Sequence, residues 1–120
     1  MSKSTINICI PVFNEEKNIK KLHEDLKIKI SDLEKKYDIS LKIVFFDDGS
    51  SDNSRQILEK LKDIELLHVE ENKGLGNAIR ELCMHSKEAK VNGMFKVDGD
   101  GQMDLDDLDK FLENDMHASK

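Results

Sequence analysis

The sequence predicts an α/β protein in which a parallel sheet carries helices on both faces. Apolar runs of strand length alternate four times with segments whose apolar residues recur at helical spacing. Such an alternation requires crossover connections between parallel strands, which are right-handed in nearly all proteins. At 120 residues the chain has the length of one domain. We therefore predict one domain over residues 1–120 with the strand order 3-2-1-4, which opens a crevice between the first and fourth strands.

The first strand and the first helix follow from the residues near the N-terminus. Residues 6–12 form an apolar run that is closed by Pro11 and by a turn at Asn14. Asn14 is a good helix N-cap, and Glu15 and Glu16 suit the positive end of a helix dipole. A helix is therefore predicted over residues 15–36. Its apolar positions are Ile19, Leu22, Leu26, Ile30, Leu33 and Tyr37.

The remaining elements continue the alternation. A second strand is predicted at residues 41–46, and its nearly unbroken apolar character is typical of a strand buried on both faces. In the turn that follows, Ser51 or Asp52 can cap a second helix. Further strands are predicted at residues 64–69 and 93–97, with one helix between them and a short helix at the end. The helix residues expected to face inward are Ile57, Leu58 and Leu61, then Leu75, Ile79, Leu82, Cys83 and Ala89, then Leu105, Leu108, Phe111 and Leu112.

Composition and charge exclude several classes of protein. The net charge is −6, and acidic residues gather between Asp98 and Asp115, which disfavours nucleic acid as a partner and favours cations. Cys9 and Cys83 lie far apart in apolar patterns, so both are predicted to be reduced core thiols of a cytosolic protein. No secretory signal is visible, and no apolar run approaches the ~18 residues that span a bilayer.

Polar side chains follow each predicted strand. Ligands of doubly wound sheets bind beyond the carboxyl ends of the strands, which is where these side chains fall. They are Asn14 and Glu15, Asp47 and Asp48, Asn72 and Lys73, and finally Asp98, Asp100 and Gln102. The sequence therefore predicts a binding site at this edge of the sheet.

Asp98 and Asp100 form an Asp-x-Asp pair at the end of the fourth strand. Carboxylates at positions i and i+2 of an extended segment fall on one side, where they repel unless a cation or a hydrogen-bonding ligand lies between them. Hard oxygen ligands suit Mg²⁺ or Mn²⁺. The alternatives are an acidic turn and an EF-hand calcium loop. The EF-hand is disfavoured because Met103 stands at its glycine position and Asp109 at its final glutamate position, and because a strand leads into the loop.

Asp47 and Asp48 end the second strand, where a carboxylate can accept hydrogen bonds from a ribose hydroxyl or a base N–H. Adjacent side chains of a strand point to opposite faces, so only one of them is expected to reach a ligand, while the other caps the turn that follows. The serines of that segment, Ser50, Ser51 and Ser54, lack a histidine partner. Local capping explains them better than nucleophilic catalysis.

Four segments stand in one order across nearly the whole chain: residues 10–16 (IPVFNEE), 46–52 (FDDGSSD), 72–76 (NKGLG) and 97–102 (VDGDGQ). In that order and spacing they resemble the family 2 nucleotide-sugar glycosyltransferases, whose GT-A fold is a Rossmann-like α/β sandwich. The Asp-x-Asp followed by Gln resembles the branch that makes polyprenyl-phosphate sugars, such as dolichyl-phosphate mannose synthase and its undecaprenyl-phosphate relatives.

The resemblance implies a role for each motif. Pro11, Phe13 and Glu15 would line the base and ribose pocket of this nucleotide-binding half. Asp48 would hydrogen-bond a uracil or guanine ring.

The other two motifs would hold the diphosphate end of the donor. By the same resemblance, Lys73 and Gly74 would flank the nucleotide, and Asp98 would contact ribose or metal. Asp100, helped by Gln102, would bind Mg²⁺ or Mn²⁺ against the diphosphate. Such a cation would stabilise the negative charge that develops on the leaving phosphate.

The resemblance implies a transferase that binds a UDP- or GDP-sugar with a divalent metal and passes the sugar to an acceptor, with polyprenyl phosphate as one candidate. Family members continue well past the Asp-x-Asp loop, so the chain is expected to be truncated at its C-terminus and to lack the catalytic base. The alternatives are a non-catalytic nucleotide- or cation-binding module that needs a partner subunit, and a structural α/β domain. The expected location is cytoplasmic, with peripheral contact at the inner face of a membrane as a variant. An exposed fourth strand would favour self-association.

Overall fold

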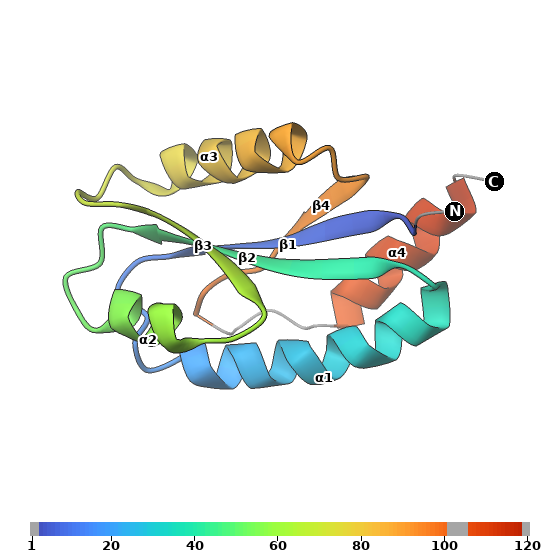
Figure 1. Cartoon of the computed structure of the whole chain (residues 1–120), viewed down its shortest axis with the longest axis horizontal. Helices are drawn as coiled ribbons and strands as arrows, with labels where there is room; N and C mark the ends of the chain where they lie inside the picture. The colour runs from blue at the N-terminus through green and yellow to red at the C-terminus, as the bar shows by residue number, and fades with distance from the viewer. Residues whose placement is uncertain (1–2, 101–105, 119–120) are drawn as a thin grey trace.

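The fold is described from a computed structural model over residues 3–100 and 106–118. Four parallel strands form one sheet in the order β3-β2-β1-β4, which confirms the predicted order. The strands are β1 (Thr5–Val12), β2 (Ser40–Asp48), β3 (Ile64–Val69) and β4 (Gly93–Lys96). The helices are α1 (Ile19–Tyr37), α2 (Ser54–Lys60), α3 (Leu75–Glu88) and α4 (Asp106–Ala118). Helix α3 covers one face of the sheet, and α1, α2 and α4 lie on the other (Figure 1).

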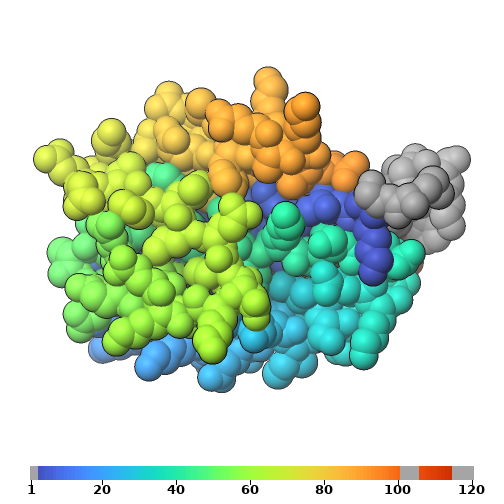
Figure 2. Space-filling view, viewed as in Figure 1, coloured from blue at the N-terminus to red at the C-terminus, as the bar shows by residue number. Residues whose placement is uncertain are grey.

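The larger part of the core lies between the sheet and α1. Alternate residues of β1 and β2 point to this face, as the two-residue period of a strand requires. Buried leucines of α1 and α4 pack against them, and Leu58 contributes from α2. Figure 2 shows the same view in space-filling form, with α2 and the edge strand β3 at the surface. The strands β1 and β2 are therefore covered on this face by α1, α2 and α4.

Helix α3 covers the opposite face through a narrower stripe. Ala78 and Leu82 pack against a small cluster that includes Val44 and Phe46 of β2. The prediction that Leu75, Cys83 and Ala89 face inward is wrong, because all three are exposed. The buried face of α3 instead follows positions four residues apart, namely Ala78, Leu82 and Ser86.

The two cysteines consequently differ in their exposure to solvent. Both are free thiols, but only Cys9 is buried, so the prediction of a second core thiol at position 83 is corrected. Cys83 follows Leu82 by one position, which turns it about 100° around the helix and away from the sheet. Burial raises the pKa of the Cys9 thiol, and a hydrogen bond to Ser86 only partly opposes that rise.

Helix α1 begins later than predicted. Its first residue is Ile19, and Asn18 rather than Asn14 stands at the N-cap position. Asn14 has a left-handed backbone with φ of 53°, which asparagine tolerates better than most residues. The side chain of Asn14 is therefore available for contacts outside the helix.

Helix α4 is attached to α1 by charged and polar side chains. The Lys29 ammonium lies 2.9 Å from the carboxylate of Asp106, and the Tyr37 hydroxyl donates to Asp109 at 2.6 Å. That hydrogen bond holds the pKa of the Asp109 carboxyl below its ordinary value and raises the pKa of Tyr37. Leu108 and Leu112 are buried as predicted, whereas Leu105 lies outside the described residues. Within the described part of the chain, no helix combines the length and the apolar character needed to cross a bilayer.

Candidate functional site

The loop after β4 lies directly against the end of β1. Gly99 is buried there, and a Cβ atom at this position would lie 2.8 Å from the carbonyl oxygen of Pro11 and 3.6 Å from Cγ of Glu15. Only glycine permits so close an approach of two backbones. Asp98 and Asp100, on either side of Gly99, are exposed. The Asp-x-Asp pair is thereby brought beside the first motif.

The loops after β1 and β2 bind each other through side chains that accept backbone hydrogen bonds. Three consecutive N–H groups of the first loop donate to side chains of the second. The bonds are Asn14 N to Ser50 Oγ at 2.9 Å, Glu15 N to Ser54 Oγ at 2.9 Å and Glu16 N to Asp52 Oδ2 at 3.2 Å. Ser50 and Ser54 thus serve a neighbouring loop, which corrects the expectation of local capping.

Backbone N–H groups of the second loop likewise donate to side chains of the first loop. Asn14 Oδ1 accepts from the N–H groups of Ser51 at 2.8 Å and Asp52 at 3.3 Å, and Glu16 Oε2 accepts from Asn53 N at 3.1 Å. Sequence reasoning missed this interlock. The available signal was the abundance of Asn, Ser and Asp in both loops, whose side chains bind backbone groups readily.

Asp52 and Glu16 are the charged members of the interlock, and the carboxyl of Asp52 has a shifted pKa. Burial raises the pKa of its carboxyl, but hydrogen bonds from the Ser54 side chain and from the backbone N–H groups of Ser54 and Glu16 outweigh burial and leave the pKa below its ordinary value. Asp52 Oδ1 accepts from Ser54 N at 2.9 Å, at the first residue of α2. Asn53, rather than the predicted Ser51 or Asp52, stands at the N-cap position of α2, although Asp52 accepts from the first N–H group of the helix.

Asp47 and Asp48 are both buried at the end of β2 and have separate partners. Asp47 Oδ1 accepts from Ser50 N at 3.3 Å, which confirms that one member of the pair caps the turn. Asp48 faces the other way, toward the loop after β3. Its Oδ1 accepts from Lys73 N at 2.9 Å, and its Oδ2 accepts from Gly74 N at 2.9 Å and from the Asn72 side chain at 3.0 Å.

Two glycines allow this contact between the second and third loops. Gly74 has φ of +98°, a conformation that other residues rarely adopt. A Cβ atom at Gly49 would lie 2.5 Å from the backbone nitrogen of Asn72. The second loop therefore touches both of its neighbours, and all four motifs meet along the carboxyl edge of the sheet.

The remaining predicted site residues differ in exposure. Phe13 is 45% exposed, whereas Pro11 beside it is buried. Glu15 is half-buried and accepts from the Asn18 side chain at 2.7 Å. Lys73 is exposed, and among the described residues its ammonium has no ionic partner. Gln102 lies outside the described residues.

The Asp-x-Asp pair suits a cation that is shared with a ligand. Asp98 is paired with Lys96 at 3.1 Å, and no group of three or more His, Cys, Asp or Glu side chains within residues 3–100 and 106–118 could hold a metal alone. Mg²⁺ commonly takes only one or two protein carboxylates and completes its shell with water and substrate phosphates. Two exposed carboxylates at the carboxyl edge of the sheet fit that pattern.

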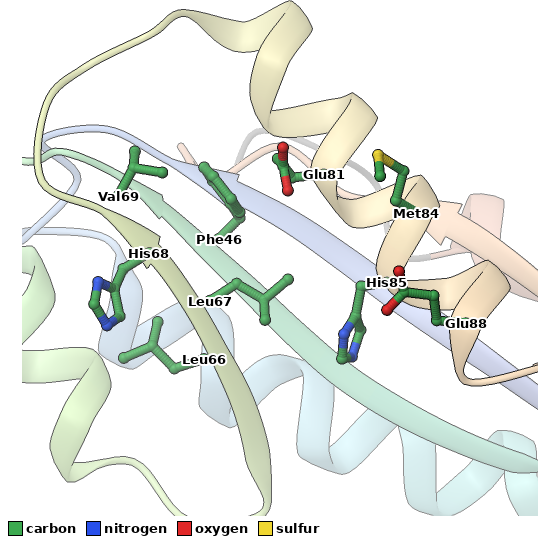
Figure 3. Close-up of a pocket in the computed structure, with 9 residues that line it drawn as sticks. All are labelled: Phe46, Leu66, Leu67, His68, Val69, Glu81, Met84, His85 and Glu88. Carbon is green, nitrogen blue, oxygen red and sulfur yellow. The ribbon is translucent and has the colours of Figure 1, made fainter.

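A hollow of about 390 Å³ lies elsewhere, between β3 and α3 (Figure 3). It is lined by Phe46, Leu66, Leu67, His68, Val69, Glu81, Met84, His85 and Glu88. None of the predicted site residues is among them. The His85 ring lies 2.9 Å from the carboxylate of Glu65, and His68 Nε2 lies 3.1 Å from the Arg55 guanidinium, so both histidines of the hollow have partners in the protein.

Comparisons with known proteins agree with the motifs. A dolichyl-phosphate beta-glucosyltransferase of Trichomonas vaginalis is 31% identical over 109 residues, which cover 87% of this chain and 33% of the relative. A UDP-N-acetylglucosamine–dolichyl-phosphate N-acetylglucosaminyltransferase of Methanococcus voltae is 30% identical and is matched over 100% of this chain and 51% of the relative. An undecaprenyl-phosphate 4-deoxy-4-formamido-L-arabinose transferase of Proteus mirabilis is 39% identical over 64 residues, 53% of this chain and 18% of the relative.

Solved structures agree on the fold. The crystal structure of S. aureus TarS 1-349 in complex with UDP superposes with a TM-score of 0.58 at 24% identity, over 92% of this chain and 32% of that one. That likeness confirms the predicted GT-A type of α/β fold. The chain spans about a third to a half of the length of the first two relatives above. The model of glycosyl transferase family 2 matches residues 7–115, and because this match runs from the first strand into the last helix, the chain belongs to glycosyl transferase family 2.

Proposed function

We propose that the chain is the donor-binding portion of a glycosyltransferase, which binds a UDP- or GDP-sugar together with Mg²⁺ or Mn²⁺ for transfer of the sugar to a polyprenyl phosphate. The observation that carries the proposal is the convergence of four loops from separate strands at the carboxyl edge of the sheet. Gly99 lies against Pro11, Asn14 binds the loop after β2, and Asp48 binds the loop after β3. Ligands of open α/β sheets bind at this edge.

The nucleoside would enter beside the first motif. Phe13 offers an exposed aromatic face next to the buried Pro11, and Glu15 lies close to the Asp-x-Asp loop. An exposed aromatic face is suited to stacking on a flat base. Asp48 lies buried at the end of the neighbouring strand, where it binds the protein's own turn.

The diphosphate would lie between Lys73 and the Asp-x-Asp pair. Lys73 and Gly74 stand at the start of α3, and the exposed Lys73 ammonium can face an anion. Asp98, Asp100 and Gln102 would hold the divalent cation against the phosphates. Such a cation supplies charge stabilisation for the departing nucleoside diphosphate.

The acceptor is proposed from the relatives. Those of Trichomonas, Methanococcus and Proteus are named for transfer to dolichyl phosphate or undecaprenyl phosphate. A sugar that is passed to such a lipid would be used at a membrane surface, so we propose peripheral contact with a membrane on the cytoplasmic side.

Calorimetric titration of the purified chain with UDP, GDP and their sugars, each with and without Mn²⁺, tests the proposal. We expect one base to be preferred and its affinity to rise at least about tenfold with Mn²⁺, which corresponds to about 1.4 kcal/mol. Binding without turnover onto a polyprenyl phosphate would support the alternative of a module that needs a partner subunit. Absence of binding to every nucleotide would overturn the proposal and leave a structural α/β domain.

A further inference from the structure

The carboxylate of Asp48 has three hydrogen-bond donors from one short turn. Lys73 N donates to Oδ1, while Gly74 N and the Asn72 amide donate to Oδ2, all at 2.9 to 3.0 Å. A carboxylate offers about four acceptor positions, so this turn uses most of them. Asp48 is only 3% exposed, which leaves little of it for a ligand.

Among the described residues, Asp48 is the carboxylate that accepts from this turn, and the backbone of the turn also lies close to Gly49. Gly74 has φ of +98°, a conformation that other residues rarely adopt, and a Cβ atom there would meet nothing within 4 Å. Asn72 and Lys73 are exposed. The carboxylate of Asp48 thus binds two consecutive N–H groups of the turn, while the Lys73 side chain between them is exposed.

We infer that Asp48 is a positioning residue, which acts on the nucleotide through Lys73 by fixing the turn of residues 72–74. This inference rests on the proposed function for its ligand. It differs from the base-contacting role that the resemblance implies, since the carboxylate would serve the diphosphate end of the donor indirectly. The structural half of the inference concerns the protein alone and can be tested without ligand.

Amide hydrogen exchange tests that half. Asp48→Asn keeps the size of the side chain but replaces one acceptor oxygen by an NH₂ group. In the variant, this NH₂ donor would face a backbone N–H donor, so one hydrogen bond would be lost. Losing one charge-assisted hydrogen bond should speed exchange of the Lys73 and Gly74 amides by about tenfold or more. Asp47→Asn is the matched control, because Asp47 accepts only from Ser50 N and should leave both amides unchanged. Unchanged exchange in Asp48→Asn would overturn the inference.

Nucleotide binding tests the other half, with UDP and GDP as probes in the presence of Mn²⁺. Asp48→Asn and Lys73→Ala should each weaken binding by about tenfold, and the double variant should be no weaker than either alone. If the two losses multiply to about a hundredfold, Asp48 acts on the ligand independently and the inference is wrong. If the wild-type chain binds neither nucleotide, the proposed function fails while the exchange result still stands.

A second variant covers the case in which Asp48→Asn does not fold. Gly74→Ala strains the turn without touching Asp48, whereas Gly76→Ala, which also meets open space, lies inside α3 at an ordinary helical backbone. Gly74→Ala should lower nucleotide affinity by about tenfold, and Gly76→Ala should preserve it. Equal affinity in these two variants would show that the conformation of the turn is irrelevant to binding.

Discussion

The acidic side chains at the carboxyl edge of the sheet fall into two kinds, which differ in burial and in their hydrogen bonds to the backbone. Asp47, Asp48 and Asp52 accept hydrogen bonds from backbone N–H groups and shape the loops. Asp98 and Asp100 are exposed beside a buried glycine. A substitution in the first kind should disturb loop geometry, whereas one in the second should disturb binding of a cation.

Asp100→Asn is expected to abolish the Mn²⁺-dependent part of UDP or GDP binding while leaving the metal-free affinity measurable. The reason is that a neutral amide is a much poorer ligand for a hard cation than a carboxylate. Calorimetry with and without Mn²⁺ provides the measurement. Asp107→Asn, which removes an exposed charge from α4, serves as the control. A retained Mn²⁺ effect in Asp100→Asn would remove Asp100 from the metal site.

Asp52→Asn is expected to make stability less dependent on pH. The carboxyl of Asp52 has a pKa below its ordinary value when folded, so its ionised form stabilises the fold at neutral pH. That contribution is present above about pH 4, the ordinary range of an aspartate, and is lost as the pH falls through the folded-state value. Urea unfolding from pH 7 to pH 2 should show the wild-type advantage shrinking in acid. The variant Asp25→Asn, an exposed position on α1, should show no such trend.

Residue roles that depend on neighbours in sequence could be predicted, and those that depend on distant loops could not. Asp47 caps the turn three residues ahead, and Asp52 accepts from Ser54 N two residues ahead, although Asn53 stands at the N-cap of α2. Asn14 was expected to act locally too, but its side chain accepts from Ser51 and Asp52, whose positions are known only once the strands are paired. Which partner the Asn14 side chain takes is decided by tertiary structure.

At the scale of elements, the alternation of strand and helix was enough to predict the sheet. Hydrophobic periodicity located all four strands, and the crossover rule restricted their order. The inward face of α3 was predicted less well, because Leu75 and Cys83 are apolar yet exposed. A short stripe of Ala78, Leu82 and Ser86 suffices there, since the helix approaches the sheet closely through small side chains.

Gly99→Ala is the element-scale test of how β4 and its loop meet β1. The added methyl group would lie 2.8 Å from the Pro11 carbonyl oxygen, so the loop must move away from the strand. We expect a loss of about 1–3 kcal/mol in the free energy of unfolding, together with weaker metal-dependent nucleotide binding. Chemical denaturation and calorimetry measure the two effects, with Gly76→Ala as the comparison. Full stability in Gly99→Ala would mean that the contact is not tight.

At the scale of the whole molecule, the sheet has two edges of different character. The β3 edge carries Glu65 and His68, and charged edges discourage pairing with another chain. The β4 edge has half-buried Met94 and Phe95, although Phe95 contacts Phe111 of α4 at a ring distance of 5.2 Å. Helix α4 thus covers part of the apolar surface beside β4.

We expect the chain to self-associate through the β4 edge at high concentration. Sedimentation velocity over a hundredfold range of about 1 to 100 μM should show growth in mean mass, since exposed strand edges pair at such concentrations. Met94→Lys places a charge on this edge and should reduce association. Met84→Lys makes the same change on α3, where Met84 is 50% exposed, and should not. A monomer at every concentration would contradict the expectation.

The interlock between residues 14–16 and 50–54 also links the local unfolding of the two loops. Each of its six hydrogen bonds has its donor on one loop and its acceptor on the other, so neither loop can fray without exposing the donors of its partner. Two connections that are far apart in sequence consequently open and close as one cooperative unit. A nucleotide that arrives would meet a wall that is already in place, and the entropy of ordering it would have been spent during folding rather than on binding.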